Sequence, residues 1–333
     1  MSKVRVVFLG TPEFAVSCLK AMYEDEHIEL VGVVTQPDRP AGRKMQLQPS
    51  AVKNFCVNQG IRVISPDSVN TEIILNTIES WSAEIAVVVA FGQLLTEKFL
   101  KIFPLGAVNV HASLLPRWRG AAPIQRSIEN GDLETGVCLQ KIVKKLDAGD
   151  VLGFRKIEIS EEMDAQILHD ELALLGQNLL HVELMDYVRG NLTGVPQEPK
   201  DVTYAKKIDK SESHIDWTLS SKQIHNKIKA FVMGPGCWTF LPQKEDKKEL
   251  KKDTPQKLKI HKVKIIDNLI EQQISNISFF QCGEVIKAEG NECWIKTNDG
   301  AIKLIEVQPE SRNKMNVADF LKGNYISVGS RLT

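Results

Sequence analysis

The sequence lacks the long apolar segments of a membrane protein. No apolar run approaches the ~20 residues that a helix needs to cross a bilayer. The short apolar stretch at residues 4–9 is followed by Gly10-Thr11-Pro12-Glu13, where a signal peptide would have a small-residue cleavage site. We therefore expect neither a targeting segment nor a membrane partner.

Paired cysteines are also missing. The six cysteines form no Cys-x-x-Cys pair and have no spacing typical of metal ligands, and the seven histidines are equally dispersed. Isolated thiols are typical of a reducing compartment, where disulfides are rare. The sequence therefore predicts a cytoplasmic protein with free thiols and without a metal site.

A third absence is the glycine fingerprint of dinucleotide-binding proteins. That fingerprint has the form Gly-x-Gly-x-x-Gly, but Pro12 and Ala15 occupy its second and third glycine positions after Gly10. A proline ring and a Cβ there would obstruct the close approach of the backbone to a pyrophosphate. A nicotinamide or flavin oxidoreductase is therefore disfavoured, and we interpret the segment as a tight turn that precedes a helix.

The formal net charge is zero, but the charges are unevenly distributed. Residues 209–333 hold 20 Lys and Arg against 16 Asp and Glu, and residues 244–264 hold nine lysines against four acids. A basic region on a neutral protein is suited to a polyanion such as a nucleic acid. A solvated lysine-rich loop would have the same composition, so charge alone leaves both interpretations open.

The length of 333 residues is sufficient for two domains. In the first half, short apolar runs alternate with amphipathic stretches, which is typical of βαβ units in a parallel sheet. The predicted strands are residues 4–9, 29–35, 62–64, 85–90 and 107–111. The predicted helices between them are residues 13–23, 51–59, 71–80 and 122–130. We therefore predict an α/β domain with a Rossmann-like, mostly parallel sheet and helices on both faces.

The rest of the chain predicts an edge hairpin, a linker and a second domain. A hairpin from residues 136–141 and 154–159 is followed by a long helix over residues 164–189. Residues 190–200 are rich in Gly and Pro, which predicts a linker over 190–208 between domains at 1–189 and 209–333. Short strands at even spacing after the helix at 220–230 favour a small C-terminal β-barrel of the OB-like kind.

The densest polar segment follows the strand at residues 107–111. Asn109 and His111 alternate with Val110, so both side chains point to one side of the sheet, ~7 Å apart along the strand. Ligands of open α/β sheets bind at the carboxyl ends of strands. An amide can stabilise an oxyanion, and an imidazole can move protons near neutral pH. A satisfied polar pair at a strand end would have the same sequence.

Two further segments are candidates for function. Asp147 lies in the Gly-containing stretch Leu146-Asp147-Ala148-Gly149-Asp150, where a carboxylate can orient an imidazole, shuttle protons or simply form a turn. Residues 36–44 contain two prolines, a glycine and the three cations Arg39, Arg43 and Lys44. That composition predicts an exposed, stiff loop whose cations bind phosphates or remain in solvent.

Together these segments resemble the folate-dependent formyltransferases along nearly the whole chain. The most specific stretch is Asn109-Val110-His111 followed by Ser113-Leu114-Leu115-Pro116-Arg117-Trp118-Arg119-Gly120. The segment around Asp147 completes the Asn, His and Asp set of that family. The resemblance is greatest to the members of the family that formylate an aminoacyl-tRNA.

The resemblance implies a reaction and a set of roles. The formyl group of 10-formyltetrahydrofolate would pass to the α-amino group of methionine on initiator tRNA, without a metal. Asn109 and His111 would stabilise the formyl oxygen, and His111 or a water held by Asp147 would take the proton. The folate would lie against Phe91, Gly92, Gln93, Leu94, Leu95, Ser113, Leu114, Leu115 and Pro116. The tRNA would contact Arg39, Arg43, Lys44 and the basic barrel of a monomeric enzyme.

Three other functions are compatible with parts of the sequence. A formyltransferase acting on a small amine, such as glycinamide ribonucleotide or an amino sugar, shares Asn109, His111 and Asp147 but does not need the cationic loop. A catalytically silent RNA-binding protein needs the basic surfaces but not these three residues. A nicotinamide oxidoreductase is disfavoured by the missing glycines.

Overall fold

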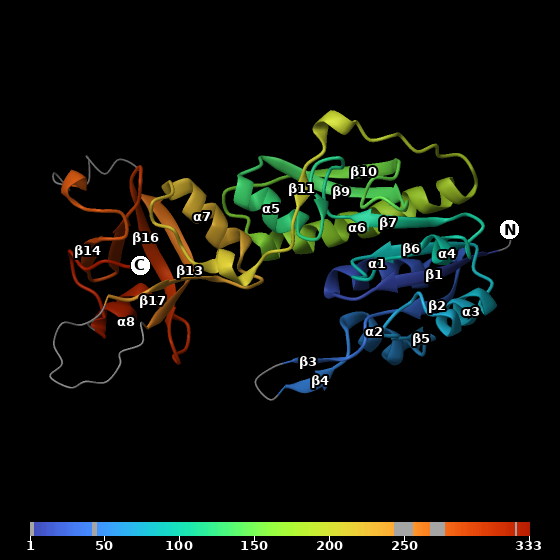
Figure 1. Cartoon of the computed structure of the whole chain (residues 1–333), viewed down its shortest axis with the longest axis horizontal. Helices are drawn as coiled ribbons and strands as arrows, with labels where there is room; N and C mark the ends of the chain where they lie inside the picture. The colour runs from blue at the N-terminus through green and yellow to red at the C-terminus, as the bar shows by residue number, and fades with distance from the viewer. Residues whose placement is uncertain (1–2, 42–44, 243–255, 267–276, 324) are drawn as a thin grey trace. The chain divides into compact units, whose positions relative to one another are not determined.

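The structure is a computed structural model that describes residues 3–41, 45–242, 256–266, 277–323 and 325–333 (Figure 1). The chain forms two compact units. The first comprises Met1–Ile124, Leu133–Ser160 and Ile167–Lys206. The second comprises Gln125–Asp132, Glu161–Gln166 and Lys207–Thr333. Two short segments from the first half of the sequence therefore pack with the C-terminal part of the chain.

A seven-stranded sheet in the order β10-β9-β7-β6-β1-β2-β5 forms the centre of the first unit. Five strands are parallel, namely β1 (Val4–Gly10), β2 (Ile28–Val34), β5 (Val63–Ile64), β6 (Ile85–Val89) and β7 (Ala107–His111). The edge hairpin of β9 (Glu134–Lys141) and β10 (Val151–Glu158) is antiparallel. The predicted mostly parallel, Rossmann-like sheet is confirmed.

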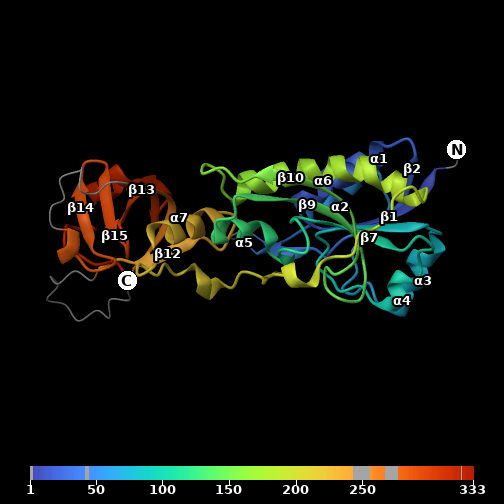
Figure 2. The same cartoon turned by 90° about the horizontal axis from the view of Figure 1, so that it is seen from above.

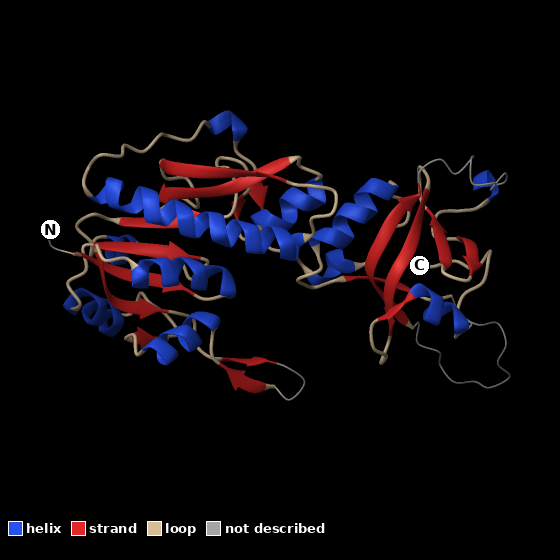
Figure 3. Ribbon diagram, turned by 180° about the vertical axis from the view of Figure 1, so that it is seen from behind, coloured by secondary structure: helices blue, strands red, loops and turns tan. Residues whose placement is uncertain are grey.

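Helices cover both faces of this sheet (Figure 2). They are α1 (Glu13–Glu24), α2 (Ala51–Gln59), α3 (Glu72–Ser80), α4 (Glu97–Leu100), α5 (Pro123–Asn130) and α6 (Ala165–Val188). The long helix α6 crosses the strands so closely that a Cβ on Gly176 would lie 3.1 Å from Val110 (Figure 3). On the other face, Ile78 of α3 and Phe99 of α4 pack into one apolar cluster with Ala107. Because strand side chains alternate, Asn109 and His111 point away from α6.

Short elements that the sequence did not predict complete the first unit. Strands β3 (Arg39–Ala41) and β4 (Gln46–Gln48) pair antiparallel as a small hairpin, of which β3 lies within the segment 36–44 that was predicted as an exposed loop and β4 lies just after it. Strand β8 (Arg119–Gly120) pairs in parallel with β11 (Tyr204–Ala205), and the 3-10 helix η1 (Pro199–Asp201) lies just before β11. The segment predicted as a linker is therefore bonded to the sheet unit along part of its length.

The second unit is an antiparallel sheet in the order β12-β13-β16-β15-β14, with β17 beside β16. These strands are β12 (Cys237–Phe240), β13 (Lys257–Ile266), β14 (Val285–Glu289), β15 (Glu292–Lys296), β16 (Ala301–Pro309) and β17 (Met315–Asn316). Backbone bonds from Val285 to Ser330 and between Phe240 and Thr333 join the two edges through the C-terminal residues. The predicted small C-terminal barrel is confirmed, because these bonds close the sheet.

Helices and one ion pair complete the second unit. Its helical elements are α7 (Ser221–Ala230), α8 (Val317–Lys322), η2 (Lys210–Ser213) and η3 (Ile277–Phe279). Arg126 of α5 donates to both carboxylate oxygens of Glu212 in η2, at 2.8 and 3.0 Å. These hydrogen bonds lower the pKa of Glu212. The pair fixes α5 to the start of the C-terminal segment.

Candidate active site

The candidate site forms where β7 ends beside the antiparallel strand β9. Asn109 lies directly opposite Gln140, and His111 lies directly opposite Cys138. Directly opposed residues of an antiparallel pair share a face, so these four side chains gather on the side away from α6. Within the described residues, no hydrogen bond engages the half-buried Asn109 amide. Its donor and acceptor atoms are therefore available to a ligand.

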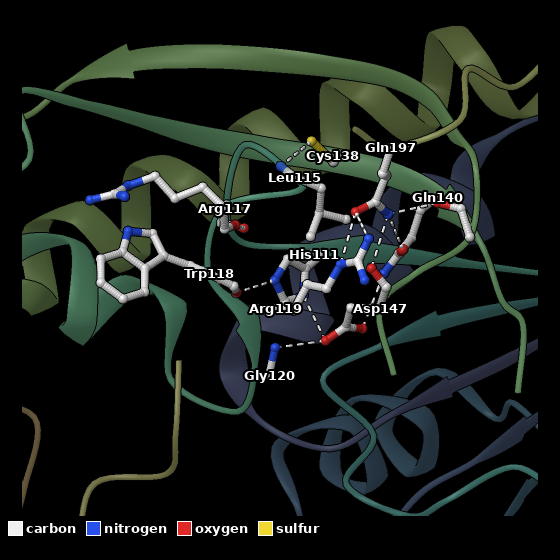
Figure 4. A network of polar contacts seen from close by, with 12 residues as sticks. His111, Leu115, Arg117, Trp118, Arg119, Gly120, Cys138, Gln140, Asp147 and Gln197 are labelled. Carbon is white, nitrogen blue, oxygen red and sulfur yellow. Dashed lines mark hydrogen bonds and ion pairs between the residues drawn. The ribbon is translucent and has the colours of Figure 1, made fainter. Parts of the chain in front are cut away.

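His111 is held between a backbone carbonyl and a carboxylate (Figure 4). The His111 side chain is 7% exposed, and its Nε2 atom lies 2.9 Å from the carbonyl oxygen of Trp118. Its Nδ1 atom lies 3.8 Å from Oδ2 of Asp147. A carbonyl oxygen only accepts hydrogen bonds, so Nε2 carries a proton and Nδ1 is the basic atom of the neutral ring. The arrangement can take a proton at Nδ1 and stabilise the resulting cation with the adjacent carboxylate.

Asp147 has a backbone conformation that few residues other than glycine adopt. Its φ angle is +43°, in the left-handed region where Asp is among the better tolerated side chains. The backbone N–H of Gly120 donates to Oδ2 at 2.8 Å, and Nε2 of Gln140 donates to Oδ1 at 3.1 Å. Two different segments of the chain therefore fix the direction of the carboxylate.

Three functional candidates were missed from the sequence, namely Arg119, Gln140 and Gln197. The Gln197 side chain donates to the carbonyl oxygens of Asp147 at 2.9 Å and Gly149 at 2.7 Å. It accepts two hydrogen bonds from Arg119, which is 4% exposed. Gln197 was not identified because a polar residue in a Gly- and Pro-rich stretch has no periodic pattern. Only the fold brings that stretch to the site.

The loop after β6 has side chains that mainly support its own shape. The Phe91 ring is buried. The backbone carbonyl oxygen of Phe91 accepts from the Thr11 hydroxyl and the Gln36 amide, at 2.9 and 3.2 Å. The Gln93 side chain accepts from the backbone N–H of Val69 and donates to the carbonyl of Pro66. Gly92 has a φ of +86°, Leu94 is exposed and Leu95 packs against the core. The loop therefore offers mainly backbone groups to a ligand.

The loop after β7 leaves the sheet beside the loop after β6, because β6 and β7 are paired in parallel. The buried Ser113 hydroxyl donates to the carbonyl of Arg117 at 2.6 Å, so it stabilises the loop. The Leu114 side chain packs against Gly136, and the Leu115 N–H donates to Sγ of Cys138. The carbonyl of Pro116 accepts from the N–H of Thr203 at 3.4 Å. The structure brings the two predicted folate segments to adjacent strand ends.

The predicted tRNA-contacting residues are described only in part. Arg39 is exposed at the base of the β3–β4 hairpin, and its guanidinium donates to Gln36 at 3.3 Å. Arg43 and Lys44 lie outside the described residues. The position of Arg39 is open to solvent and therefore accessible to a large ligand.

A second basic surface lies on β13. Lys257, Lys259, Lys262 and Lys264 are exposed, and none forms an ion pair with another described residue. The pairing with β16 is irregular at His261, which inserts one residue into the strand. This bulge keeps lysines 262 and 264 on the same face as lysines 257 and 259. We name these four residues the lysine row; it provides a cationic strip on one face of the barrel.

The class of protein follows from matches to two known families. Residues 3–184 match the family described as formyl transferase, and residues 207–325 match the formyl transferase C-terminal domain. The methionyl-tRNA formyltransferase of Bdellovibrio bacteriovorus is 54% identical, covering 100% of this chain and 99% of that protein. That of Sulfurihydrogenibium sp. is 40% identical, covering 98% and 99%. The chain belongs to the methionyl-tRNA formyltransferase family.

Two solved structures of other proteins have the same fold. The N-formyltransferase from Helicobacter canadensis, in complex with folinic acid and dTDP-3-aminofucose, has a TM-score of 0.61 and 18% identity, covering 91% of this chain and 99% of that one. HypX from Aquifex aeolicus in complex with tetrahydrofolic acid has a TM-score of 0.60 and 15% identity, covering 98% and 48%. At these identities the likeness establishes the fold alone.

Proposed function

We propose that this enzyme transfers the formyl group of 10-formyltetrahydrofolate to the α-amino group of methionine on the initiator tRNA. The amine nitrogen attacks the formyl carbon, and the bond from that carbon to N10 of the folate breaks. The amine loses a proton, and N10 gains one. The products are formyl-methionyl-tRNA and tetrahydrofolate, so the reaction needs no other reactant.

We assign stabilisation of the formyl oxygen to Asn109. Its amide has no hydrogen-bond partner among the described residues, and it lies at the end of a rigid strand. A preorganised donor of this kind contributes about 3–4 kcal/mol to transition-state stabilisation. The family resemblance implies the same role for His111, but its Nε2 hydrogen is directed to the Trp118 carbonyl. Asn109 is therefore the better candidate for the first donor.

We assign proton transfer to His111 and Asp147. The observation that carries this assignment is the position of Nδ1, which faces the Asp147 carboxylate at 3.8 Å while Nε2 is bonded elsewhere. Nδ1 takes the proton from the attacking amine, directly or through a water, and returns it to N10 of the leaving folate. Asp147 stabilises the imidazolium between these two transfers.

The donor site is proposed at the loops after β6 and β7, formed by Phe91–Leu95 and Ser113–Pro116. The side chains of Gln93 and Ser113 support the loops, so we expect the pterin to be recognised mainly by backbone groups. The folate bound to structural neighbours supports a folate co-substrate for this fold. No residue role here requires a metal.

The tRNA is proposed to bind the second unit and the β3–β4 hairpin. Arg39, Arg43 and Lys44 are the candidates on the hairpin, and the lysine row is the candidate on the barrel. Four exposed lysines on one strand face, which form no ion pair with the described residues, are suited to a phosphate backbone. We accordingly propose a catalytic domain over residues 1–189, a linker over 190–208 and a tRNA-binding domain over 209–333.

We further propose that the enzyme acts as a monomer in the cytoplasm. All six cysteines are free thiols, which is typical of a reducing compartment. Within the described part of the chain, no helix is both long and apolar enough to cross a membrane.

The experiment that tests this function offers the enzyme alternative acceptors. Purified protein is incubated with 10-formyltetrahydrofolate and methionine-charged initiator or elongator tRNA, and formyl-methionine is measured. We expect formylation of the initiator tRNA alone, and its loss in His111→Ala. If neither tRNA is formylated, the proposed acceptor is wrong. Formylation of glycinamide ribonucleotide or an amino sugar would then establish the small-amine alternative, which full-length identity to methionyl-tRNA formyltransferases disfavours.

A further inference from the structure

We infer that Gln197 is a positioning residue of the transfer reaction, which holds the loop that carries Asp147; this inference rests on the proposed role of Asp147. Gln197 lies in the segment between α6 and β11, far in sequence from the other site residues. Figure 4 shows it beside Asp147 and Gln140, on the side of Asp147 opposite to Gly120.

The hydrogen-bonding capacity of the Gln197 amide is fully used. A primary amide has two N–H donors and two acceptor lone pairs. The donors go to the carbonyl oxygens of Asp147 and Gly149, at 2.9 and 2.7 Å, and the same nitrogen makes a longer contact of 3.4 Å with Oε1 of Gln140. The oxygen accepts from Nε and Nη2 of Arg119, at 3.0 and 2.7 Å. If the amide were reversed, its N–H groups would face the N–H groups of Arg119, and its oxygen would face the carbonyl oxygens of Asp147 and Gly149. The partners therefore fix the orientation of the amide.

The loop needs such support because of its conformation. Asp147 has a left-handed φ of +43°, a conformation that is strained in a residue other than glycine and persists only when the surroundings impose it. Gly120 and Gln140 fix its carboxylate, whereas Gln197 fixes its backbone carbonyl. The positions of the side chain and of the main chain are therefore set by different partners.

The segment that carries Gln197 is anchored on both sides. Val195 exchanges two backbone hydrogen bonds with Val151, at 2.8 and 2.9 Å. Thr203 accepts from the N–H groups of Trp118 and Arg119 through its hydroxyl and carbonyl oxygens, each at 2.9 Å. Gln197 therefore lies in a segment that is anchored on both sides, and its hydrogen bonds hold the Asp147 loop against that segment.

The consequence concerns the distance between Asp147 and His111. The carboxylate lies 3.8 Å from Nδ1, so a small displacement of the loop decides whether it stabilises the imidazolium. A shift of ~1 Å in a reacting group can cost 10²-fold in rate. Loss of the Gln197 donors is therefore expected to lower kcat roughly 10- to 100-fold and to leave KM for both substrates within about twofold.

The decisive variant is Gln197→Glu, compared with Gln197→Ala. A glutamate accepts the same hydrogen bonds from Arg119, but it cannot donate to the two carbonyl oxygens. We expect Gln197→Glu to remain folded, with a Tm lowered because the two carbonyl oxygens lose their donors, and to lose the same factor in kcat as Gln197→Ala. Gln59→Ala, which changes an exposed glutamine at the end of α2, is the matched control. Wild-type kcat in Gln197→Glu would overturn the inference.

Two further measurements separate this role from a general structural one. In an Asp147→Asn background, adding Gln197→Glu should lower kcat by less than a further factor of two, because Gln197 acts through Asp147. Trypsin cleavage after the exposed Lys144 and Lys145 of the same loop should be faster in Gln197→Glu than in wild type or Gln59→Ala. Equal losses of kcat in both backgrounds, or unchanged cleavage, would contradict the inference. Cleavage needs no substrate, so it still tests the inference if the proposed acceptor is wrong.

Discussion

At the scale of single residues, most polar groups of the site hydrogen-bond to one another or to the backbone, whereas the amide of Asn109 is left for the substrate. His111, Asp147, Gln140 and Gln197 are joined in one network of contacts with the backbone. Buried polar groups are normally satisfied in this way, because an unpaired one costs ~1–3 kcal/mol. Asn109 stands beside the network, and its side chain has no hydrogen-bond partner in the part of the chain that the structure describes. This difference is what distinguishes a ligand-binding amide from a structural one.

Replacement of Asn109 by Ala should lower kcat/KM by about 10²- to 10³-fold, because one donor to the developing oxyanion is lost. Binding of tetrahydrofolate, which lacks the formyl group, should be unchanged. Single-turnover formyl transfer and equilibrium binding of the product folate measure the two quantities. Asn58→Ala, on the exposed face of α2, is the control. Equal weakening of product-folate binding would show that Asn109 serves binding and not the transition state.

At the scale of elements, a one-residue irregularity decides which face the cations of β13 occupy. Strict alternation from Lys257 would place His261 outward and Lys262 inward. The bulge at His261 restores the pattern, so Leu258, Ile260 and Val263 face the core while the lysine row stays in solvent. The strand thus keeps both a core and a continuous basic face.

Conversion of the four lysines of the row to alanine should weaken initiator tRNA binding and reduce its dependence on salt. Each lost phosphate contact lowers the slope of log K against log salt by ~0.7–0.9, so the slope should fall by about 3 in total. Fluorescence titrations at several salt concentrations measure this slope. Lys222→Ala, on the exposed side of α7, should leave it unchanged. An unchanged slope in the fourfold variant would exclude the row from the interface.

At the scale of the whole molecule, thiols are distributed through both units and are nearly all buried. Burial raises the pKa of Cys18, Cys138, Cys237 and Cys293 to about 12, and that of Cys56 to about 11. The thiolate is the reactive form, so these groups are inert at neutral pH. Cys282 is only partly buried.

A thiol reagent at pH 8 should therefore modify Cys282 first, and Cys282→Ser should remove the fast phase. Reaction with a chromogenic disulfide measures this effect. A fast phase that persists in Cys282→Ser would contradict this assignment of burial.

The raised pKa values also make the folded state less stable in alkali. Their stabilising contribution is complete below the unfolded pKa of ~8.5 and is lost as the pH rises towards 11 to 12. Urea unfolding between pH 8 and 11 measures this effect.

The sequence by itself determined the local elements and the motif residues. Apolar periodicity placed the parallel strands and the helices α1, α2, α3 and α5 to within one or two residues, because strands buried on both faces need continuous apolar runs, but it did not predict the short helix α4. Asn109, His111 and Asp147 became candidates through their places at a strand end and in a glycine-containing loop, and the resemblance to the folate-dependent formyltransferases joined them into one set. The cation-rich segment 36–44 was predicted as a loop, although part of it is the β3–β4 hairpin.

Only the tertiary structure decided which distant segments meet. Gln197 reaches Asp147, 50 positions away, because Val195 pairs with Val151 and β11 pairs with β8. Segments Gln125–Asp132 and Glu161–Gln166 join the second unit although they lie within the stretch predicted as the first domain. Sequence patterns report how each segment buries its own apolar face. They do not report which polar groups of remote segments hydrogen-bond to one another. Every residue has backbone polar groups, and any polar side chain of suitable length can donate or accept.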